Sequence, residues 1–317
     1  MKLATYSKGS ASKLGIVVGD DILDPSHGAL SGAPGRGRWR DVGALLQHDC
    51  EALDGLRRLV AWVKNSENRQ AMLREMGAIV PMAGVHLLAP VPKPSLLLCI
   101  GRSYGRHVVE MLGSKAQLPK TPNGFLKSPH CVVGPEDPIL LPAQNPDMVD
   151  FEGEIAIVFG RKCFNVPAEQ ALDYVAGYTL ANEVSARDWN APHGQPQNWD
   201  MVRLGKQFPT FFPMGPVLVT ADEAGDPCNL PIATTVNGET MQDSTTADLL
   251  FTFAEMISYY SRWYEFHPGD VLSTGTPEGV GASRNPPAFL RNGDEVTVSS
   301  PALGALTNPV IDTARQS

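Results

Sequence analysis

The chain has few cysteines and no long apolar run, and each shortage excludes a class of protein. Its five cysteines are scattered, odd in number and free of any Cys-x-x-Cys pair, which argues against a disulfide framework and a zinc site. No segment approaches the roughly 18 apolar residues of a membrane span, and the first residues lack the apolar stretch of a signal peptide. We therefore expect a soluble, cytoplasmic protein without a membrane partner.

Positive charge is also in short supply. Lys and Arg total 26 against 34 Asp and Glu, for a net charge of −8 and a pI near 5.4. A nucleic-acid-binding face needs an excess of basic residues, and the one basic cluster, GRGRWR at residues 35–40, is short and glycine-rich. We expect that cluster to be a solvated loop and expect no nucleic-acid partner.

What the chain has in quantity is glycine, proline and short apolar runs. The 317 residues are 43% hydrophobic and include 30 Gly and 27 Pro, which is typical of a fold with a sizeable core and many turns. Residues 14–25 alternate like a hairpin, and residues 49–65 have helical periodicity. Three prolines within residues 88–95 predict a stiff linker. We expect a small domain over residues 1–88 and a larger one over 89–317.

The larger segment reads as an α+β, mostly β unit with peripheral helices. Short strand candidates alternate with turn signals, and one clear helix candidate spans residues 247–264. The strand candidates are LLLCIG, GEIAIVFG, YVAGYTLANEV, GPVLVTADE, ATTVNGETMQ, GDVLSTGTPEG and GDEVTVSS.

Two carboxylates stand at the start of the strand candidate in DFEGEIAIVFG, residues 150–160. Glu152 and Glu154 are two apart and therefore share a face of the strand. Two partly desolvated like charges so close need a proton or a cation between them. Glu183 ends another strand candidate and would complete an all-oxygen set, which suits Mg²⁺, Mn²⁺ or Ca²⁺. The alternative is that all three are surface acids paired with basic residues.

A histidine and a glutamate follow the LLLCI strand candidate. His107 and Glu110 are three apart and share a face if residues 101–111 form a helical turn. A carboxylate beside an imidazole raises its pKa and orients the ring, which suits a general base acting on water. The alternative is a solvated pair on a helix surface.

Two further segments carry less specific signals. Lys206 lies among apolar residues, where a lysine would stabilise a developing enolate or would extend from the surface to solvent. Residues 273–281 are rich in glycine and hydroxyls and would present N–H groups to an anion, but they are not a phosphate loop.

Taken in order, these motifs closely resemble the fumarylacetoacetate hydrolase family over residues 85–310. The resemblance rests on eight blocks that occur in the family's order: GRSYGRHVVEM, FLKSP, DFEGEIAIVFG, NEVSARDWN, GKQFPTFFPMGP, VNGETMQDS, GDVLSTGTPEGVG and LRNGDEVTV. It implies a mixed β-roll catalytic core behind a small N-terminal α/β domain. It also implies a homodimer, a divalent metal, commonly Mg²⁺, and a 2-oxo acid or 1,3-dicarbonyl substrate.

The resemblance also assigns residues to roles. Glu152, Glu154 and Glu183 match the metal ligands. His107 and Glu110 match the pair that activates water, and Lys206 matches the lysine that stabilises the enolate. The positions that match substrate-binding residues are Tyr104, Lys127, Arg187, Asn190 and Thr276.

Three positions depart from the family pattern. Glu183 replaces an Asp, and its extra methylene is expected to shift the metal or relax the preference for Mg²⁺, which requires near-octahedral geometry. Ser103 replaces an Asn, and Asn190 replaces a Gln and is expected to widen the pocket. Residues 191–203, which include His193, Asp200 and Arg203, are expected to form a pocket wall, and no role is assigned to any of them.

The leading functional hypothesis is a metal-dependent hydrolase of the C–C bond in an acylpyruvate-type substrate. The alternatives are an oxaloacetate-type decarboxylase or keto–enol isomerase on the same fold, and a non-catalytic binding protein with a structural metal. Hydrolysis needs an activated water, so the His107–Glu110 pair favours the first hypothesis over the second.

Overall fold

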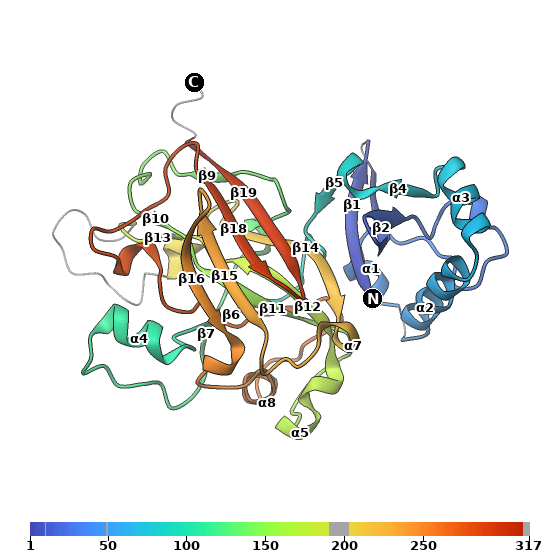
Figure 1. The fold of residues 1–317 in the computed structure, drawn as a ribbon. Coiled ribbons are helices and arrows are strands. Elements are labelled where there is room, and N and C mark those ends of the chain that lie inside the picture. The colour runs from blue at the N-terminus through green and yellow to red at the C-terminus, as the bar shows by residue number, and fades with distance from the viewer. Residues whose placement is uncertain (10, 49, 190–202, 313–317) are drawn as a thin grey trace.

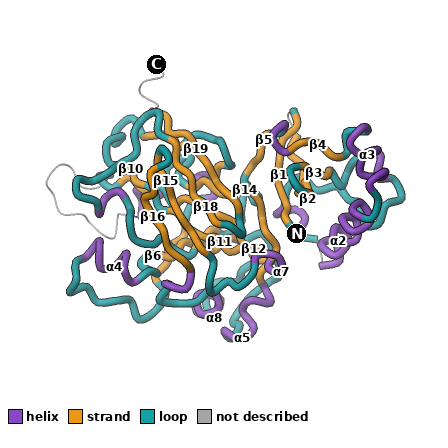
Figure 2. The backbone as a smooth tube through the Cα atoms, in the orientation of Figure 1, coloured by secondary structure: helices purple, strands orange, loops and turns teal. Residues whose placement is uncertain are grey.

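The computed structural model describes residues 1–9, 11–48, 50–189 and 203–312. Figure 1 shows a large body of strands with a smaller unit of strands and helices beside it. The helices are α1 (Val42–Leu46), α2 (Cys50–Lys64), α3 (Glu67–Glu75), α4 (Gly105–Leu112), α5 (Ala168–Ala171), α7 (Ala221–Ala224) and α8 (Phe253–Ser261). Strands outnumber helices in the large body, as the orange and purple segments of Figure 2 show.

The largest sheet runs through both parts of the molecule. Its strand order is β4-β3-β2-β1-β14-β12-β11-β17-β6-β7, with β5 and β8 attached to β1 and β14. Its strands are β1 (Lys2–Lys8), β2 (Ala11–Val18), β3 (Asp21–Leu23), β4 (Ile79–Pro81), β5 (His86–Leu88), β6 (Leu97–Gly101), β7 (Asn123–Leu126), β8 (Val132–Val133), β11 (Gly153–Phe159), β12 (Val175–Asn182), β14 (Phe212–Thr220) and β17 (Val271–Ser273).

Two smaller sheets complete the large body. A five-stranded sheet has the order β16-β15-β18-β19-β9, and β10 pairs with β13. Their strands are β9 (Ile139–Leu141), β10 (Val149–Asp150), β13 (Ser185–Ala186), β15 (Pro231–Val236), β16 (Glu239–Thr245), β18 (Glu295–Ser300) and β19 (Gly304–Asp312). The α+β, mostly β class expected from the sequence is confirmed.

The apolar run of β11 is buried on both of its faces, which explains why it is continuous rather than alternating. Ile155 and Ile157 belong to the core shared with the five-stranded sheet and α8. Ala156 and Val158 belong to the core shared with β1 and α2 of the N-terminal unit. The strand therefore connects two of the three hydrophobic clusters in the described residues.

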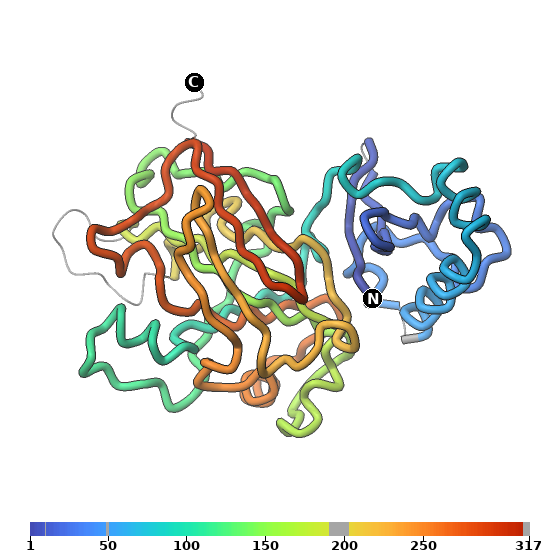
Figure 3. Tube along the Cα trace, in the orientation of Figure 1, coloured from blue at the N-terminus to red at the C-terminus, as the bar shows by residue number. Residues whose placement is uncertain are grey.

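The N-terminal unit is joined to the large body by main-chain pairing. β1 pairs antiparallel with β14, with Leu3 opposite Leu218. The tube in Figure 3 shows the blue N-terminal strand running beside the yellow strand of the large body. The division at residue 88 stays a prediction, since one sheet continues across both parts.

Most elements expected from the sequence are present. The predicted hairpin is β2 and β3, with Val18 opposite Asp21, and the predicted helix at residues 49–65 is α2. The helix candidate at 247–264 is shorter, because Thr252 begins α8 with a capping box. Every helix among the described residues is too short or too polar to span a bilayer.

Candidate active site

Three buried carboxylates meet where β11 begins and β12 ends. Glu152 precedes β11, Glu154 lies within it, and Glu183 follows β12, whose residue Asn182 pairs with Gly153. The amide of Glu183 donates to the carbonyl of Glu152 at 2.8 Å, which fixes the two backbones together. One oxygen from each carboxylate lies within 4.8 Å of the others. The strand pairing thus brings the predicted ligands together.

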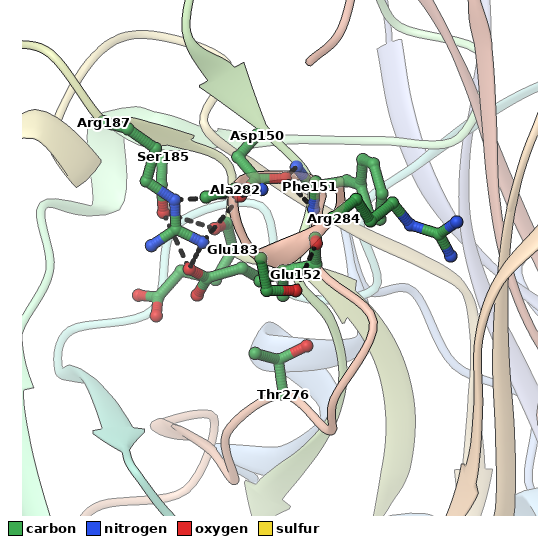
Figure 4. A network of polar contacts seen from close by, with 12 residues as sticks. Asp150, Phe151, Glu152, Glu183, Ser185, Arg187, Thr276, Ala282 and Arg284 are labelled. Carbon is green, nitrogen blue, oxygen red and sulfur yellow. Dashed lines mark hydrogen bonds and ion pairs between the residues drawn. The ribbon is translucent and has the colours of Figure 1, made fainter. Parts of the chain in front are cut away.

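Two basic side chains, Arg187 and Lys206, neutralise part of this acidic cluster, and Figure 4 shows Arg187 beside Asp150 and Glu152. The Arg187 guanidinium lies 2.7 Å from Glu152 Oε1 and 2.8 Å from Asp150 Oδ2. The Lys206 ammonium lies 2.6 Å from Glu152 Oε2 and 3.1 Å from Glu183 Oε2. Burial alone would raise the pKa of Glu152, but these cations outweigh it and lower that pKa to about 2. Glu152 is therefore an anion at any physiological pH.

Glu154 has no such partner. Its Oε2 accepts hydrogen bonds from Ser273 Oγ at 2.5 Å and from the amide of Gly275 at 3.0 Å, but it forms no ion pair with the described residues. Burial and the charge of Glu183 raise its pKa well above the ordinary value of 4.5. The Oε1 of Glu183 is also buried without a hydrogen bond. The cluster therefore has the charge and the open lone pairs to hold a cation.

The chemistry of the donor set limits which cation fits. All three side chains offer only carboxylate oxygens, which favours a hard divalent ion. Cys99 lies behind them, and burial together with the Glu183 charge raises the pKa of its thiol well above the ordinary value. Cys99 is therefore a neutral thiol, and a soft-metal site is disfavoured. The residues present fit a hard divalent cation of the kind expected from the sequence, Mg²⁺, Mn²⁺ or Ca²⁺.

Helix α4 carries an imidazole held by a carboxylate. His107 Nδ1 lies 2.9 Å from Glu110 Oε1. Glu110 in turn accepts from the amide of Gly279, at 3.1 and 3.0 Å, and from Ser283 Oγ at 2.9 Å. Burial would raise the pKa of Glu110, but His107 and these donors lower it below its ordinary value. The Glu110 carboxylate is thus fixed as an acceptor for His107 Nδ1, which leaves Nε2 available.

A cavity of about 130 Å³ joins α4 to the carboxylates. Most of the site residues predicted from the sequence line it: His107, Glu152, Glu154, Glu183, Arg187, Lys206 and Thr276. Glu110 lies behind His107 rather than on the wall. Asn190, His193 and Asp200 lie outside the described residues.

Two predicted substrate-binding residues lie away from this cavity wall. Lys127 has a fully buried side chain that donates to the carbonyl of Lys206 and lies 3.7 Å from Glu183 Oε1. Tyr104 is 1% exposed at the start of α4. Lys127 is thus placed to fix the backbone of Lys206 and to offset the charge of Glu183. Contact of Lys127 and Tyr104 with a substrate stays a prediction.

Residues 101–105, Gly-Arg-Ser-Tyr-Gly, match the Gly-x-Ser-x-Gly pattern of a serine-hydrolase nucleophile. The structure gives this match another explanation. Ser103 is 1% exposed, and its hydroxyl donates to the carbonyl of Thr274 at 2.6 Å. The hydroxyl therefore ties the start of α4 to the strand end that also carries Ser273.

Sequence reasoning did not identify the residues that position the site. Asp150 accepts from the amides of Gly281 and Ala282 while it pairs with Arg187. Ser273 and Gly279 hold Glu154 and Glu110. Asp150 lies two residues before the predicted Glu-x-Glu, and Ser273 and Gly279 lie in the hydroxyl- and glycine-rich segment 273–281. All three therefore belong to segments that the sequence analysis singled out. Apart from Arg187, which is 37 residues from Asp150, their partners lie more than 100 residues away in the chain.

The comparison with family models decides the family. Residues 97–311 match the model described as fumarylacetoacetate (FAA) hydrolase C-terminal. The chain belongs to the fumarylacetoacetate hydrolase family. The resemblance read from the eight sequence blocks is confirmed, and so is the β-roll fold that it implied.

Relatives within the family differ in activity. The chain is 42% identical to rat (Rattus norvegicus) mitochondrial oxaloacetate tautomerase Fahd2a over 243 residues, 77% of this chain and 74% of that one. It is 37% identical to oxaloacetate tautomerase YisK of Bacillus subtilis (strain 168) over 256 residues, 80% and 81% of the two chains. A maleylpyruvate hydrolase from Sphingobium sp. SYK-6, solved with manganese(II) and pyruvate, is 30% identical over 98% of this chain and 99% of that one, with a TM-score of 0.74.

These similarities bear unequally on the functional hypotheses. The tautomerases and the maleylpyruvate hydrolase are all named for small 2-oxo acids, oxaloacetate and maleylpyruvate. The hydrolase class that led the hypotheses is not confirmed, because the tautomerases share more sequence with this chain than the maleylpyruvate hydrolase does. The isomerase alternative has the better support.

Proposed function

We propose that the protein is a divalent-metal-assisted keto–enol tautomerase acting on oxaloacetate or a similar small 2-oxo acid. The observation that carries the proposal is the oriented imidazole of His107 facing the carboxylates Glu152, Glu154 and Glu183 across a cavity of about 130 Å³. Tautomerisation moves a proton between an enol oxygen and the neighbouring carbon. One base beside a bound 2-oxo acid is sufficient for that step.

His107 is suited to move this proton. Because Nδ1 donates to Glu110, the lone pair of Nε2 is free to take a proton from the enol hydroxyl and return one to carbon. Glu110 stabilises the imidazolium that forms between these two events. The anchoring of Glu110 by Gly279 and Ser283 keeps the ring in one orientation throughout.

The carboxylates and the lysine hold the reacting group. Glu152, Glu154 and Glu183 would bind a divalent ion, which supplies a Lewis acid for the 2-oxo acid oxygens. The Lys206 ammonium, beside Glu152 and Glu183, places positive charge near the oxygen that becomes enolate. Mg²⁺ and Mn²⁺ are the proposed ions, with Glu183 expected to relax the choice between them.

C–C bond hydrolysis is the second candidate. It is supported by the His107–Glu110 pair, which would equally orient water, and by the maleylpyruvate hydrolase among the similar structures. It ranks second because the tautomerases share more sequence with this chain than the maleylpyruvate hydrolase does. The homodimer and the cytoplasmic location expected from the sequence stay predictions.

The test follows the ultraviolet absorbance of enol oxaloacetate with purified protein in Mg²⁺, in Mn²⁺ and in EDTA. We expect metal-dependent acceleration of ketonisation without loss of carbon. His107→Asn should slow it by about 10²- to 10⁴-fold, the usual contribution of a general base. His130→Asn, a change at an exposed histidine, is the matched control and should leave the rate unchanged.

Product analysis separates the two candidates. Pyruvate and a carboxylic acid released from an acylpyruvate, without acceleration of oxaloacetate ketonisation, would replace the tautomerase with the hydrolase. Equal rates for the wild type and the His107→Asn variant would contradict both mechanisms.

A further inference from the structure

Arg203 stands between the cavity of the active site and a second, open space. It begins the short helical turn Arg203–Lys206 and lines the 130 Å³ cavity that contains the three carboxylates. It also lines an adjoining groove of about 900 Å³. Arg102 and Asn123 border both spaces as well, so the two spaces adjoin at these three side chains.

The charge of Arg203 differs from that of the two buried cations beside the carboxylates, Arg187 and Lys206. The Arg187 guanidinium and the Lys206 ammonium are each paired with carboxylates of the acidic cluster. Arg203 forms no ion pair with any described residue, although it lies on the same wall. Its positive charge is therefore available to an anion that enters the cavity.

The Arg203 side chain is nevertheless positioned. Its Nη2 donates to Asn123 Oδ1 at 3.2 Å, and its guanidinium carbon lies 5.9 Å from the centre of the Phe125 ring. Asn123 belongs to β7, where it pairs with Gly101 at the end of β6. A guanidinium held by one amide and one ring keeps other N–H groups free to bind a carboxylate, and a positioned fork loses less entropy when it does so.

The groove beyond Arg203 has no acid of its own among the described residues that line it. Its wall combines aromatic rings with basic side chains, and Trp263 there is 60% exposed. The aromatic members are Tyr259, Tyr260, Trp263 and Tyr264. An anion bound at Arg203 would therefore meet no repulsive carboxylate on the groove side.

We propose that Arg203 binds the carboxylate of the substrate that is remote from the metal-binding acids, so that the site selects 2-oxo dicarboxylates over 2-oxo monocarboxylates. This inference rests on the proposed function, in which the 2-oxo acid end of the substrate lies at Glu152, Glu154 and Glu183. Oxaloacetate has such a second carboxylate, and pyruvate does not. Arg203 is then a specificity-determining residue with no part in the proton transfer.

The inference is tested by equilibrium binding rather than turnover. Calorimetry with the Mg²⁺- or Mn²⁺-loaded protein compares malate with lactate, two unreactive 2-hydroxy acids that differ in the second carboxylate. We expect the wild type to bind malate more tightly. Arg203→Met should weaken malate binding by about 10- to 100-fold, the range for lost charge-assisted hydrogen bonds, and should leave lactate binding within about twofold.

Two further variants make the result specific. Lys120→Met removes a positive charge from the same groove at a position that does not line the catalytic cavity, and it should leave the malate-to-lactate ratio unchanged. Arg203→Lys keeps the charge without the fork and should recover part of the preference. A thermal unfolding curve for each variant checks that the fold is intact.

The outcomes separate this inference from the proposed function. A wild type that binds malate no better than lactate, or an Arg203→Met variant that loses both ligands equally, overturns the role of Arg203. An Arg203-dependent preference for malate in a protein that does not tautomerise oxaloacetate retains the dicarboxylate site and rejects the proposed reaction.

Discussion

The N-terminal unit buries Asp24 and the large body buries Glu154, and the two acids differ in the partners that the fold gives them. In the N-terminal unit Asp24 accepts from Lys13 Nζ at 2.7 Å and from Ser26 Oγ and N at 2.5 and 2.9 Å. In the large body Glu154 accepts from Ser273 and Gly275 only and has no cation among the described residues. The charge of Asp24 is balanced by a cation of the fold, whereas the described residues form no ion pair that balances the charge of ionised Glu154.

The contrast appears in the two pKa values. Burial would raise the pKa of Asp24, but Lys13 and Ser26 outweigh it and lower the pKa below its ordinary 3.8. Burial and neighbouring carboxylates raise the pKa of Glu154 well above 4.5. The lowered pKa means that the ionised form of Asp24 stabilises the folded chain, whereas the raised pKa means that ionising Glu154 costs free energy in the metal-free fold.

The largest effect is expected from Glu154→Gln. The change removes a proposed metal ligand worth several kcal/mol in the reaction, so kcat/KM should fall by about 1000-fold or more. In EDTA the same variant should be as stable as the wild type or more stable, because glutamine avoids the free-energy cost of burying an acid beside the Glu183 charge, while its amide oxygen still accepts from Ser273. Steady-state kinetics and thermal unfolding in EDTA measure the two effects.

A Glu154→Gln variant that unfolds at a clearly lower temperature would mean that Glu154 is a structural acid like Asp24. Retention of full metal-dependent activity would remove it from the proposed ligands. Calorimetric titration with Mn²⁺ reports ligand loss independently of catalysis.

Asp24→Asn should have the opposite profile. Loss of charge-assisted hydrogen bonds at a 5% exposed residue should lower the free energy of unfolding by about 1–3 kcal/mol. Activity at a temperature where the variant is folded should stay within about twofold of the wild type. Denaturant titration and oxaloacetate turnover test this pair, and a stability equal to that of the wild type would contradict the structural role.

The pH dependence of the two acids should also be opposite, with a smaller effect. The stability contributed by Asp24 is present above its unfolded pKa, near 3.8, and is lost as pH falls through its lower folded value. Glu154 keeps its proton in the metal-free fold above 4.5, so its contribution falls as pH rises toward its raised folded pKa. Denaturant titrations in EDTA at several pH values resolve the two slopes.

The affinity for metal should rise with pH, opposite to the fall in stability that Glu154 gives the metal-free fold. A metal ligand must be deprotonated, so apparent affinity should rise with pH by up to about tenfold per unit until the folded pKa of Glu154 is passed. Calorimetry in two buffers of different ionisation heat counts the protons released. Affinity that is flat from pH 5 to 8 would show that Glu154 is already ionised without metal.

Local sequence patterns predicted the parts of this molecule that depend on neighbours in the chain. The apolar run after Glu152 predicted β11, and the three-residue spacing of His107 and Glu110 placed them on one helical face. The Glu-x-Glu spacing and the strand end at Glu183 were sufficient to suggest a cation site.

What the local patterns could not reach are contacts between distant segments. Nothing near Glu110 indicates that Gly279 and Ser283 hold it, and nothing near Lys206 indicates that its ammonium lies against Glu152 and Glu183. Such contacts depend on strand order, which alternation alone does not encode. The exposed Arg203 carries no local signal that separates it from a solvated arginine.

The pairing of β1 with β14 has a consequence for cutting the chain into its two parts. Without the N-terminal unit, the main-chain groups of β14 that β1 covers would form a free strand edge. The apolar face that includes Phe212, Met214 and Leu218 would lose its cover at the same time. An open edge beside a bare apolar surface is a template for aggregation. We therefore expect the large body to aggregate when it is produced without the N-terminal unit, although it carries the whole candidate site.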